Sequence, residues 1–356
     1  MTSANAKKLR EKQKTFENLM RLYSRIRHVH GPQKPGGSKN DVVVACLVRN
    51  GEEYIDAFLR HYFSLGAKHA VFMDNGSTDS TVARAKRHKN VTVLSCRTRL
   101  GRDEVVLRRY LAKDFCAGRW CLCADIDEFF DYPFSKTVKL SALTRYLSSR
   151  SYTAVVTQML DMFSDKPLDE LPSGPDRFSR KDHPCYDISG IRKIDYFSSP
   201  PAKLMRDNVA ANPDIKFHMG GIRKSLFGTE NWLTKHQLFF ADEPDIIDAH
   251  CVNGAHLADF SAACLHYKFT RSIFARTREY VRRHFGSCLE EYKAIVRAPE
   301  NPRLFLGRPA ARRLNRVEDL VKSDFLAVSD AYARWAKRLE TLQRDSTKRA
   351  GIRQSA

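Results

Sequence analysis

The chain has 356 residues, of which 42% are hydrophobic and 10% aromatic, so it can bury a large core and is not globally disordered. Its 61 lysines and arginines exceed its 41 acidic residues, and the formal charge of +20 favours anionic partners: phosphorylated substrates, nucleic acid or an anionic membrane surface. No apolar run approaches the roughly 20 residues of a membrane-spanning helix, and residues 1–10 lack a signal-peptide core. We therefore expect a cytoplasmic protein, or one held peripherally at the inner membrane face by its basic ends.

The N-terminal part is expected to be a basic helical extension with a linker, spanning residues 1–40. Apolar residues recur at helical spacing over Ala6–His28, and the Gly- and Pro-rich run Gly31–Ser38 follows. Nine cysteines are scattered through the chain without a disulfide or zinc spacing, so they are interpreted as free thiols in a reducing compartment. Cys121 and Cys123 should share one face of a strand.

From residue 41 the pattern alternates between short apolar runs and amphipathic segments. Strands are predicted at 41–48, 69–73, 91–95 and 119–124, and helices at 52–65, 78–88 and 104–115. This alternation predicts an α/β fold with a mostly parallel sheet. Beyond it we expect a helix at 140–147, a strand at 152–159, long loops over 165–214 and a strand at 265–269. A large domain is placed at 41–270, and a basic helical region at 271–356.

Ligands of open parallel sheets bind beyond the carboxyl ends of the strands, so the residues after each strand are the first to consider. Asp125 and Asp127 follow a buried strand, and carboxylates two residues apart on an extended segment point the same way. They can hold Mn²⁺ or Mg²⁺, which prefers oxygen ligands and shares them with substrate phosphates. A solvated acidic loop is the alternative. Asp74 and the pair Arg49–Asn50 end two other strands; Ser77, Thr78 and Asp79 fit the cap and first turn of the next helix.

Three sequence blocks in this order resemble family-2 glycosyltransferases, in the bacterial branch with RNxE, DNGSTD and DIDEF motifs. They are the segments beginning at Arg49, at Asp74 and at Asp125, and a looser similarity continues to about residue 270. The resemblance implies a GT-A fold and inverting, metal-dependent transfer of a sugar from a nucleotide-diphosphate donor. The acceptor implied is a glycan or lipid-linked sugar of a bacterial surface polysaccharide.

The resemblance also implies roles for individual residues. Asp74 would contact the nucleoside, Arg49 and Asn50 would line the nucleotide pocket, and Asp125 would contact both donor and metal. Asp127 would be a further metal ligand, together with His250 or His266. Arg102, with Arg109 nearby, would lie beside the donor. Asp161 is the expected base, and Asp165 and Asp187 are the alternatives. For His266 a buried structural role is the alternative, and Lys235 is interpreted as an exposed lysine, with a phosphate contact as the alternative.

Two other functions are compatible with parts of the sequence. The basic ends would suit a nucleic-acid-binding protein, but that function leaves the acidic strand ends unexplained, so no specific nucleic acid is expected. A degenerate transferase acting as a scaffold is disfavoured by the intact pair Asp125 and Asp127. A dinucleotide-binding dehydrogenase is disfavoured because no Gly-x-Gly-x-x-Gly follows the first strand.

Overall fold

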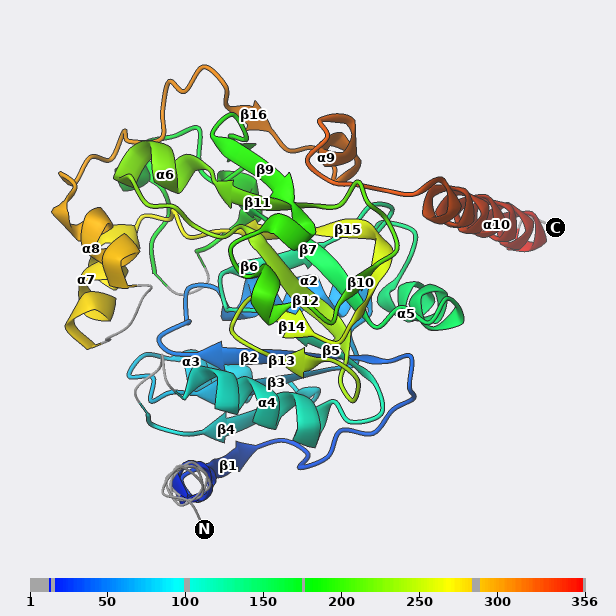
Figure 1. The fold of residues 1–356 in the computed structure, drawn as a ribbon, viewed down its shortest axis with the longest axis horizontal. Helices are drawn as coiled ribbons and strands as arrows, with labels where there is room; N and C mark the ends of the chain where they lie inside the picture. Colours follow the sequence, from blue (N-terminus) through cyan, green and yellow to red (C-terminus); the bar gives the residue numbers. More distant parts are fainter. Residues whose placement is uncertain (1–12, 14–16, 99–102, 175–176, 284–288, 355–356) are drawn as a thin grey trace, which may run out of the picture.

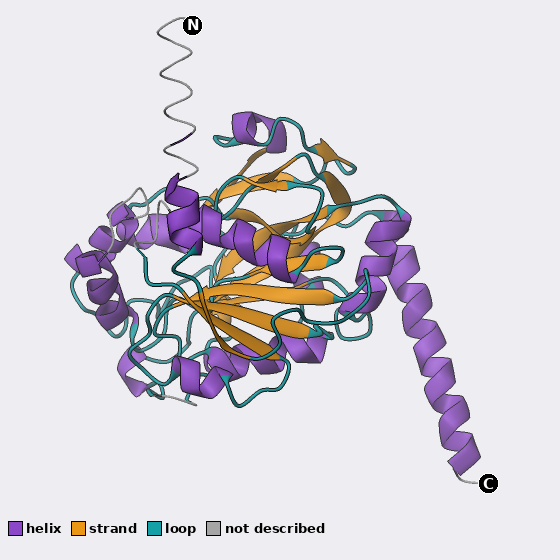
Figure 2. Cartoon of the chain, turned by 90° about the horizontal axis from the view of Figure 1, so that it is seen from below, coloured by secondary structure: helices purple, strands orange, loops and turns teal. Residues whose placement is uncertain are grey.

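The structure is a computed structural model that describes residue 13 and residues 17–98, 103–174, 177–283 and 289–354. A ten-stranded sheet forms its centre, with helices on both faces (Figures 1 and 2). The strands, in spatial order, are β1 (Arg27–His30), β4 (Val91–Ser95), β3 (His69–Asp74), β2 (Val42–Val48), β5 (Trp120–Cys123), β12 (Thr234–Phe240), β7 (Ala154–Asp161), β15 (His256–His266) and β10 (Val209–Ala210), with β6 (Glu128–Asp131) also paired to β15.

The sheet is mixed and mostly parallel, as the sequence predicts. Strands β4, β3, β2 and β5 form one parallel block, and β7, β15 and β10 form another. Strand β12 runs antiparallel to both β5 and β7 and joins the two blocks. Strand β1 adds to β4 in antiparallel orientation, and so does β6 to β15. All parallel strands of the first block therefore end at one edge of the sheet.

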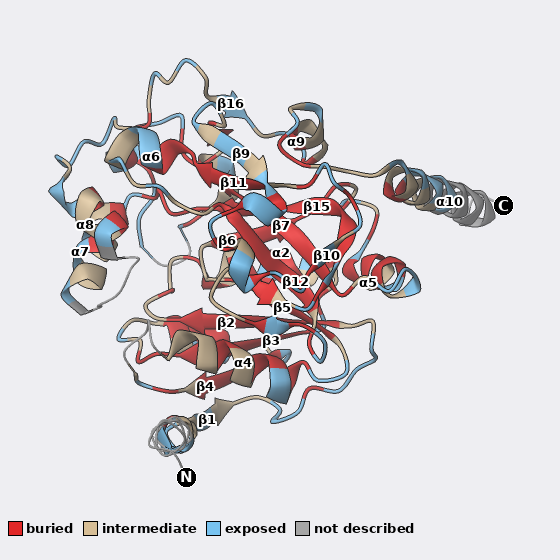
Figure 3. Ribbon diagram, viewed as in Figure 1, coloured by how far each residue is buried: buried red, intermediate tan, exposed pale blue. Residues whose placement is uncertain are grey.

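Helices cover both faces because both faces of the parallel strands are apolar. The helices are α2 (Ile55–Leu65), α3 (Thr81–Ala85), α4 (Glu104–Phe115), α5 (Leu140–Ser149), α6 (Ile222–Phe227), α7 (Ile273–Arg283), α8 (Leu289–Arg297), α9 (Glu318–Lys322) and α10 (Asp330–Gln354). Along β2, Val44 and Cys46 join the core cluster that includes α2 and α5, whereas Val43 and Ala45 join the cluster that includes α4. The period of two thus separates two core layers, and Figure 3 shows the buried strands between more exposed helices.

The predicted N-terminal helix ends earlier than His28. Residues 17–23 are helical, and then Arg27–His30 forms the edge strand β1, where Val29 packs on the core. Residues 6–12 and 14–16 of the prediction lie outside the described residues. The helix was predicted too long because Ile26 continues the helical spacing of the apolar residues before it, whereas residues 27–30 instead form hydrogen bonds with β4. A strand before residue 40 thus belongs to the large sheet.

Several predicted elements differ in extent from the structure. The helix expected at 78–88 is the shorter α3, and the strand expected at 265–269 is β15, which begins nine residues earlier. The expected long loops contain short strands and 3-10 turns. These elements are β8 (Cys185–Tyr186), β9 (Ile191–Asp195) and the turns Leu168–Glu170, Arg180–Asp182, Tyr196–Ser198 and Ala202–Leu204. Strand β9 pairs with β11 (Lys216–Gly220), β8 with β16 (Arg312–Arg313), and β13 (Asp245–Ile246) with β14 (Val252–Asn253).

The C-terminal region is only partly helical, because residues 298–311 form an irregular connection between α8 and β16. Helix α10 starts against the core, where Tyr332 stacks on Phe260 with ring centroids 4.0 Å apart. Its later turns project away from the body of the molecule (Figure 1). The helix is therefore attached to the sheet at its first turns.

The described cysteines are free thiols, most of them buried. The Sγ atoms of Cys121 and Cys123 lie 3.8 Å apart on β5, which confirms that the two side chains share a face. Over the described part of the chain, no helix has both the length and the apolar character needed to cross a bilayer.

Candidate functional site

A cavity of about 250 Å³ opens at the carboxyl ends of β2 and β5. Four of the predicted site residues line it: Arg49 and Asn50 after β2, and Asp125 and Asp127 after β5. They come together because β2 and β5 are adjacent and parallel. The structure therefore gathers the first and third sequence blocks around one cavity.

Helices α7 and α8 contribute another part of the cavity wall. Arg276 and Glu279 on α7 line it, and so does Lys268 shortly before that helix. The guanidinium of Arg276 lies 5.1 Å from the ring centre of Tyr54. Sequence analysis missed Arg276 and Glu279 because the segment after residue 272 was interpreted as a basic helical region, and it missed Lys268 because that residue fell within the strand predicted at 265–269. The signal that could have found them is the position of this basic helix directly after the last strand of the sheet.

Asp125 is held as a carboxylate by two buried cations. Arg108 Nη2 donates to Asp125 Oδ1 at 2.6 Å, and Lys235 Nζ lies 3.6 Å from Oδ2. Burial opposes ionisation of Asp125, but Arg108 and Lys235 outweigh it and hold its pKa well below the usual range. The side chain is nevertheless 37% exposed, so it remains accessible from the cavity.

Asp127 faces two further cations. Its Oδ2 lies 3.6 Å from His266 Nε2 and 3.9 Å from an Arg276 guanidinium nitrogen. Burial opposes its ionisation too, but His266 and Arg276 outweigh burial and lower the pKa of Asp127 to about 2. Both members of the pair are thus ionised at neutral pH, which is the state that binds a cation.

Asp161 lies behind Asp127 and is linked to it through His266. The ring of His266 contacts Asp161 Oδ1 through Nδ1 at 2.6 Å, and Arg223 Nε donates to Asp161 Oδ2 at 2.8 Å. Both oxygens of this buried carboxylate are engaged, and Asp161 is not among the residues that line the cavity. Burial opposes ionisation here, but Arg223 and His266 outweigh it and lower the pKa of Asp161. The geometry gives Asp161 the role of orienting His266 rather than that of an acceptor-facing base.

His266 is protonated in this arrangement. Burial works against its charge, but Asp127 and Asp161 outweigh burial and raise its pKa to about 9. A histidine binds a metal ion only as a neutral imidazole. The His266 ring is instead a cation between two carboxylates, so as placed it is not in the state that binds a metal. His250 is neutral, since burial and nearby Lys235 hold its pKa well below the usual range. Its Nδ1 is buried without a hydrogen-bond partner among the described residues, and His250 does not line the cavity.

Lys235 is buried, contrary to its interpretation as an exposed lysine. Its Nζ contacts Glu128 Oε1 at 2.5 Å, and Gln237 Nε2 donates to Glu128 Oε2 at 2.9 Å. Burial opposes the charge of Lys235, but Glu128 and Asp125 outweigh it and raise its pKa. The side chain therefore supports the Asp125 carboxylate from behind the cavity. This role could not be predicted from the sequence because β12, which carries Lys235, was not predicted.

The other predicted residues shape loops near the cavity. The carboxylate of Asp74 accepts backbone N–H bonds from Gly76 and Ser77, so it stabilises its own turn and does not line the cavity. Asn50 has a positive φ of 51°, and its Oδ1 accepts the N–H of Thr78 at 2.8 Å. Arg49 Nη1 donates to the carbonyl of Asn75 at 2.8 Å. Arg49 and Asn50 thus join the loops after β2 and β3.

The helix cap after β3 differs from the prediction. Ser80 is the N-cap of α3, and the N–H of Thr81 donates to Asp79 at 3.0 Å. Glu52 Oε2 accepts the N–H of Ser80 at 2.9 Å, so acidic side chains satisfy two free donors at this helix start. Ser77 and Thr78 precede the helix and do not cap it.

Four further residues named from the sequence lie away from the cavity lining or outside the described residues. Arg102 is outside the described residues. Arg109 Nε donates to the carbonyl of Ile246 at 2.8 Å and does not line the cavity. The alternative bases Asp165 and Asp187 pair with Arg313 and Arg308, respectively.

The donor set fits a hard divalent cation only in part. Within the described residues, no group of three or more His, Cys, Asp and Glu side chains is arranged to hold a metal ion. Mg²⁺ and similar ions are commonly held by one or two carboxylates together with substrate phosphates, and Asp125 and Asp127 supply two ionised carboxylates on the cavity wall. The site therefore suits a metal that the substrate helps to bind.

The cavity lining combines four carboxylates, those of Glu104, Asp125, Asp127 and Glu279, with four cations. Arg49, Arg108, Lys268 and Arg276 all line it. An anionic ligand that brings a divalent cation would meet complementary charges on both sides.

Searches of protein-family models and of curated proteins gave no match to this chain.

Proposed function

We propose that this protein is a metal-dependent glycosyltransferase of GT-A type that uses a nucleotide-diphosphate sugar. The acceptor is a glycan or lipid-linked sugar, such as a precursor of a bacterial surface polysaccharide. One observation carries the proposal: Asp125 and Asp127 line the same cavity as Arg49, Lys268 and Arg276, at the carboxyl ends of adjacent parallel strands. Carboxylates for a cation beside cations for phosphate are the complement of a metal-bound diphosphate.

In this proposal the residues divide the work by charge. Asp125 and Asp127 hold Mn²⁺ or Mg²⁺, and the ion offsets the charge that develops on the departing nucleotide diphosphate. Arg49, Lys268 and Arg276 bind the phosphate oxygens, which charged donors stabilise more strongly than neutral ones. Arg108 and Lys235 keep Asp125 ionised and oriented from behind.

Inverting transfer also requires a base that takes the proton of the acceptor hydroxyl. Asp161 is buried, and its two oxygens contact His266 and Arg223, so it is not assigned the role of the base. Glu104 and Glu279 are the carboxylates that line the cavity besides the metal pair, and we assign the base to this set. A peripheral contact of the basic ends with an anionic membrane, where lipid-linked acceptors reside, belongs to the same proposal.

The experiment is a donor screen on the full chain. UDP-, GDP- and dTDP-sugars are each added with Mn²⁺ or with EDTA, and thermal stabilisation and donor hydrolysis are measured. The proposal predicts that at least one donor stabilises the protein and is hydrolysed with Mn²⁺ but not with EDTA. The matched control is Asp245→Asn, an exposed aspartate, which should behave as the parent chain.

The proposal is contradicted if no donor stabilises the protein with Mn²⁺. If DNA or RNA then binds in a strongly salt-dependent manner, the nucleic-acid-binding alternative replaces the proposal.

A further inference from the structure

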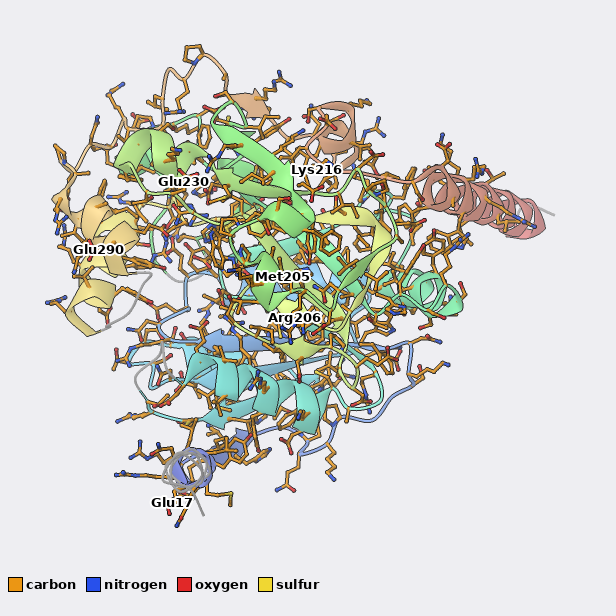
Figure 4. All side chains as sticks on the ribbon, in the orientation of Figure 1. Glu17, Met205, Arg206, Lys216, Glu230 and Glu290 are labelled. Atoms are coloured by element: carbon orange, nitrogen blue, oxygen red, sulfur yellow. The ribbon has the colours of Figure 1, made fainter. Side chains whose placement is uncertain are left out.

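A second cavity, of about 510 Å³, lies between the antiparallel pair of β9 and β11 and the segment that follows α9. Its lining residues come from β7, β9, β11 and the two residues before it, β15, Val321 and residues 324–328, and none of them lines the cavity at Asp125. Lys216 on β11, labelled in Figure 4, is one of them. The volume falls within the about 300–1,000 Å³ typical of small-molecule sites. It is therefore a separate candidate site.

Both lysines that line this cavity are paired with carboxylates, and Asp214 adds a further carboxylate to the lining. Lys193 Nζ lies 2.6 Å from Asp324 Oδ2, and Lys216 Nζ lies 3.8 Å from Asp195 Oδ2. An anionic ligand would have to compete with these carboxylates. The lining therefore favours a neutral ligand over a phosphate.

Buried polar side chains contribute to the lining. Gln158 Nε2 donates to the carbonyl of Lys216 at 2.8 Å, and Ser261 Oγ accepts the N–H of Ala327 at 2.9 Å. His218 differs from them: the residue is 2% exposed, and its Nδ1 has no hydrogen-bond partner among the described residues. A buried polar atom without a partner carries a desolvation cost that a ligand hydroxyl can remove.

The imidazole of His218 is neutral at physiological pH. Burial, and then the charge of Lys193, lower its pKa to about 3. A neutral ring has one nitrogen that donates and one that accepts. A hydroxyl group can do either, so it matches both tautomers of the ring.

The segment after α9 gives the cavity an apolar side. Phe325 and Leu326 line it, and the Phe325 ring lies 5.0 Å from the His218 ring, centroid to centroid. A site with an apolar surface and a few convergent polar groups is typical of small-molecule recognition. A pyranose ring has this character, because its C–H face is apolar and its edge carries hydroxyls.

We propose that this cavity binds a neutral mono- or disaccharide, with hydroxyls at His218 and Lys216 and the apolar ring face against Phe325. The site is distinct from the proposed donor site and requires neither a metal nor a nucleotide. It would hold a glycan unit while the chemistry takes place elsewhere.

The test is a titration of the full chain, in EDTA, with glucose, galactose, N-acetylglucosamine, lactose and maltose, followed by ligand-observed NMR and calorimetry. Saturable binding of at least one sugar is expected, and UDP should not compete with it. If none of the five sugars binds, or if inorganic phosphate binds the same site instead, the proposal is overturned.

Variants locate the site. His218→Phe keeps an aromatic ring without its nitrogens and should weaken sugar binding at least about tenfold, the effect of one lost hydrogen bond. Lys216→Ala changes a partly exposed position, so it tests the same site if His218→Phe fails to fold.

Asp125→Asn, in the other cavity, is the control and should leave sugar binding unchanged. Loss of binding in Asp125→Asn, or unchanged affinity in a folded His218→Phe and in Lys216→Ala, would place the sugar elsewhere and refute the proposal.

Discussion

Lys235 is a buried cation that faces two carboxylates, those of Glu128 and Asp125, behind the cavity. It is buried and contacts Glu128 at 2.5 Å and Asp125 at 3.6 Å. Buried charges are stable only when they are paired, because removing one partner leaves the other desolvated and uncompensated. Lys235 is therefore a buried residue, although the polar residues around it in the sequence are typical of an exposed segment.

Lys235→Met should therefore destabilise the protein by about 3–5 kcal/mol, since it leaves Glu128 buried without its cation. The measurement is the free energy of unfolding in urea. Lys224→Met is the control, because Lys224 is about half exposed and pairs with Glu230 at the surface. Its cost should stay below about 1 kcal/mol. Equal effects of the two substitutions would show that Lys235 is not buried in an ion pair.

His266 predicts a pH dependence of stability. Its pKa of about 9 in the folded protein lies above its ordinary value of 6.5, so its charge stabilises the folded state fully below pH 6.5. That contribution is lost as the pH rises through about 9. In EDTA, the difference in unfolding free energy between the parent chain and His266→Gln should thus shrink between these two values. A difference that stays constant, or grows, with rising pH would mean that His266 is neutral in the fold.

At the scale of elements, the sequence predicts the parallel block from β2 to β5 because its strands are apolar on both faces. The same reasoning fails for β12, whose first four residues, Thr-Lys-His-Gln, are polar although they are buried, and so resemble a solvated segment. It also fails for much of β15, where Asp259 is buried because it accepts a hydrogen bond from Tyr146 at 2.8 Å. Partners from distant parts of the chain decide both cases, and no local pattern encodes them.

The residues of the candidate site also fall into those that the sequence could predict and those that it could not. Asp125 and Asp127 were identifiable because they follow a buried strand directly, and the geometry of parallel strands brings Arg49 to the same cavity. Arg276 and Lys268 were not identifiable, because their place at the cavity depends on how α7 packs. Asp161 was correctly placed at the end of a strand, but its two ion-pair partners come from β15 and α6. Position on a strand was predictable, whereas partners across the fold were not.

The edge strand β1 gives a test of the sheet. Gly31, which follows it, has a φ of +82°, and a Cβ there would lie 2.0 Å from the carbonyl oxygen of Val91 on β4. Gly31→Ala should therefore cost at least about 1–3 kcal/mol of unfolding free energy through backbone strain.

Gly36→Ala is the matched control for this substitution. A Cβ at Gly36 would have no atom within 4 Å, and the residue has no positive φ. It should be neutral or stabilise by up to about 1 kcal/mol. Thermal unfolding of both variants decides the matter, and a neutral Gly31→Ala would show that β1 does not pair with β4 as described.

At the scale of the whole molecule, the C-terminal region is structurally continuous with the sheet. Tyr332 on α10 is fully buried, stacks on Phe260 of β15 and donates a hydrogen bond to the carbonyl of Pro133 at 2.8 Å. The backbone of β15 also bridges to Val328. The expected basic extension is thus anchored on the core before it projects outward.

Tyr332→Ala should destabilise the entire fold by about 3–5 kcal/mol, as large-to-small aromatic substitutions in cores do. Because the contact joins the end of the chain to the central sheet, far-UV and near-UV circular dichroism should report a single shifted urea transition. Leu342→Ala, farther along α10 and 55% exposed, should change stability by less than about 0.5 kcal/mol. A separate early transition in Tyr332→Ala, with the main one unchanged, would mean that α10 folds independently of the sheet.

The most direct test of the account concerns the two aspartates at the end of β5. Calorimetric titration of Mn²⁺ in the presence of the diphosphate of the preferred nucleotide would compare the parent chain with a folded Asp125→Ala, Asp127→Ala double variant. We predict that the parent chain binds the metal and the nucleotide together, and that the double variant loses at least about 100-fold in metal affinity. Unchanged affinity and full transfer activity in the double variant would contradict the account.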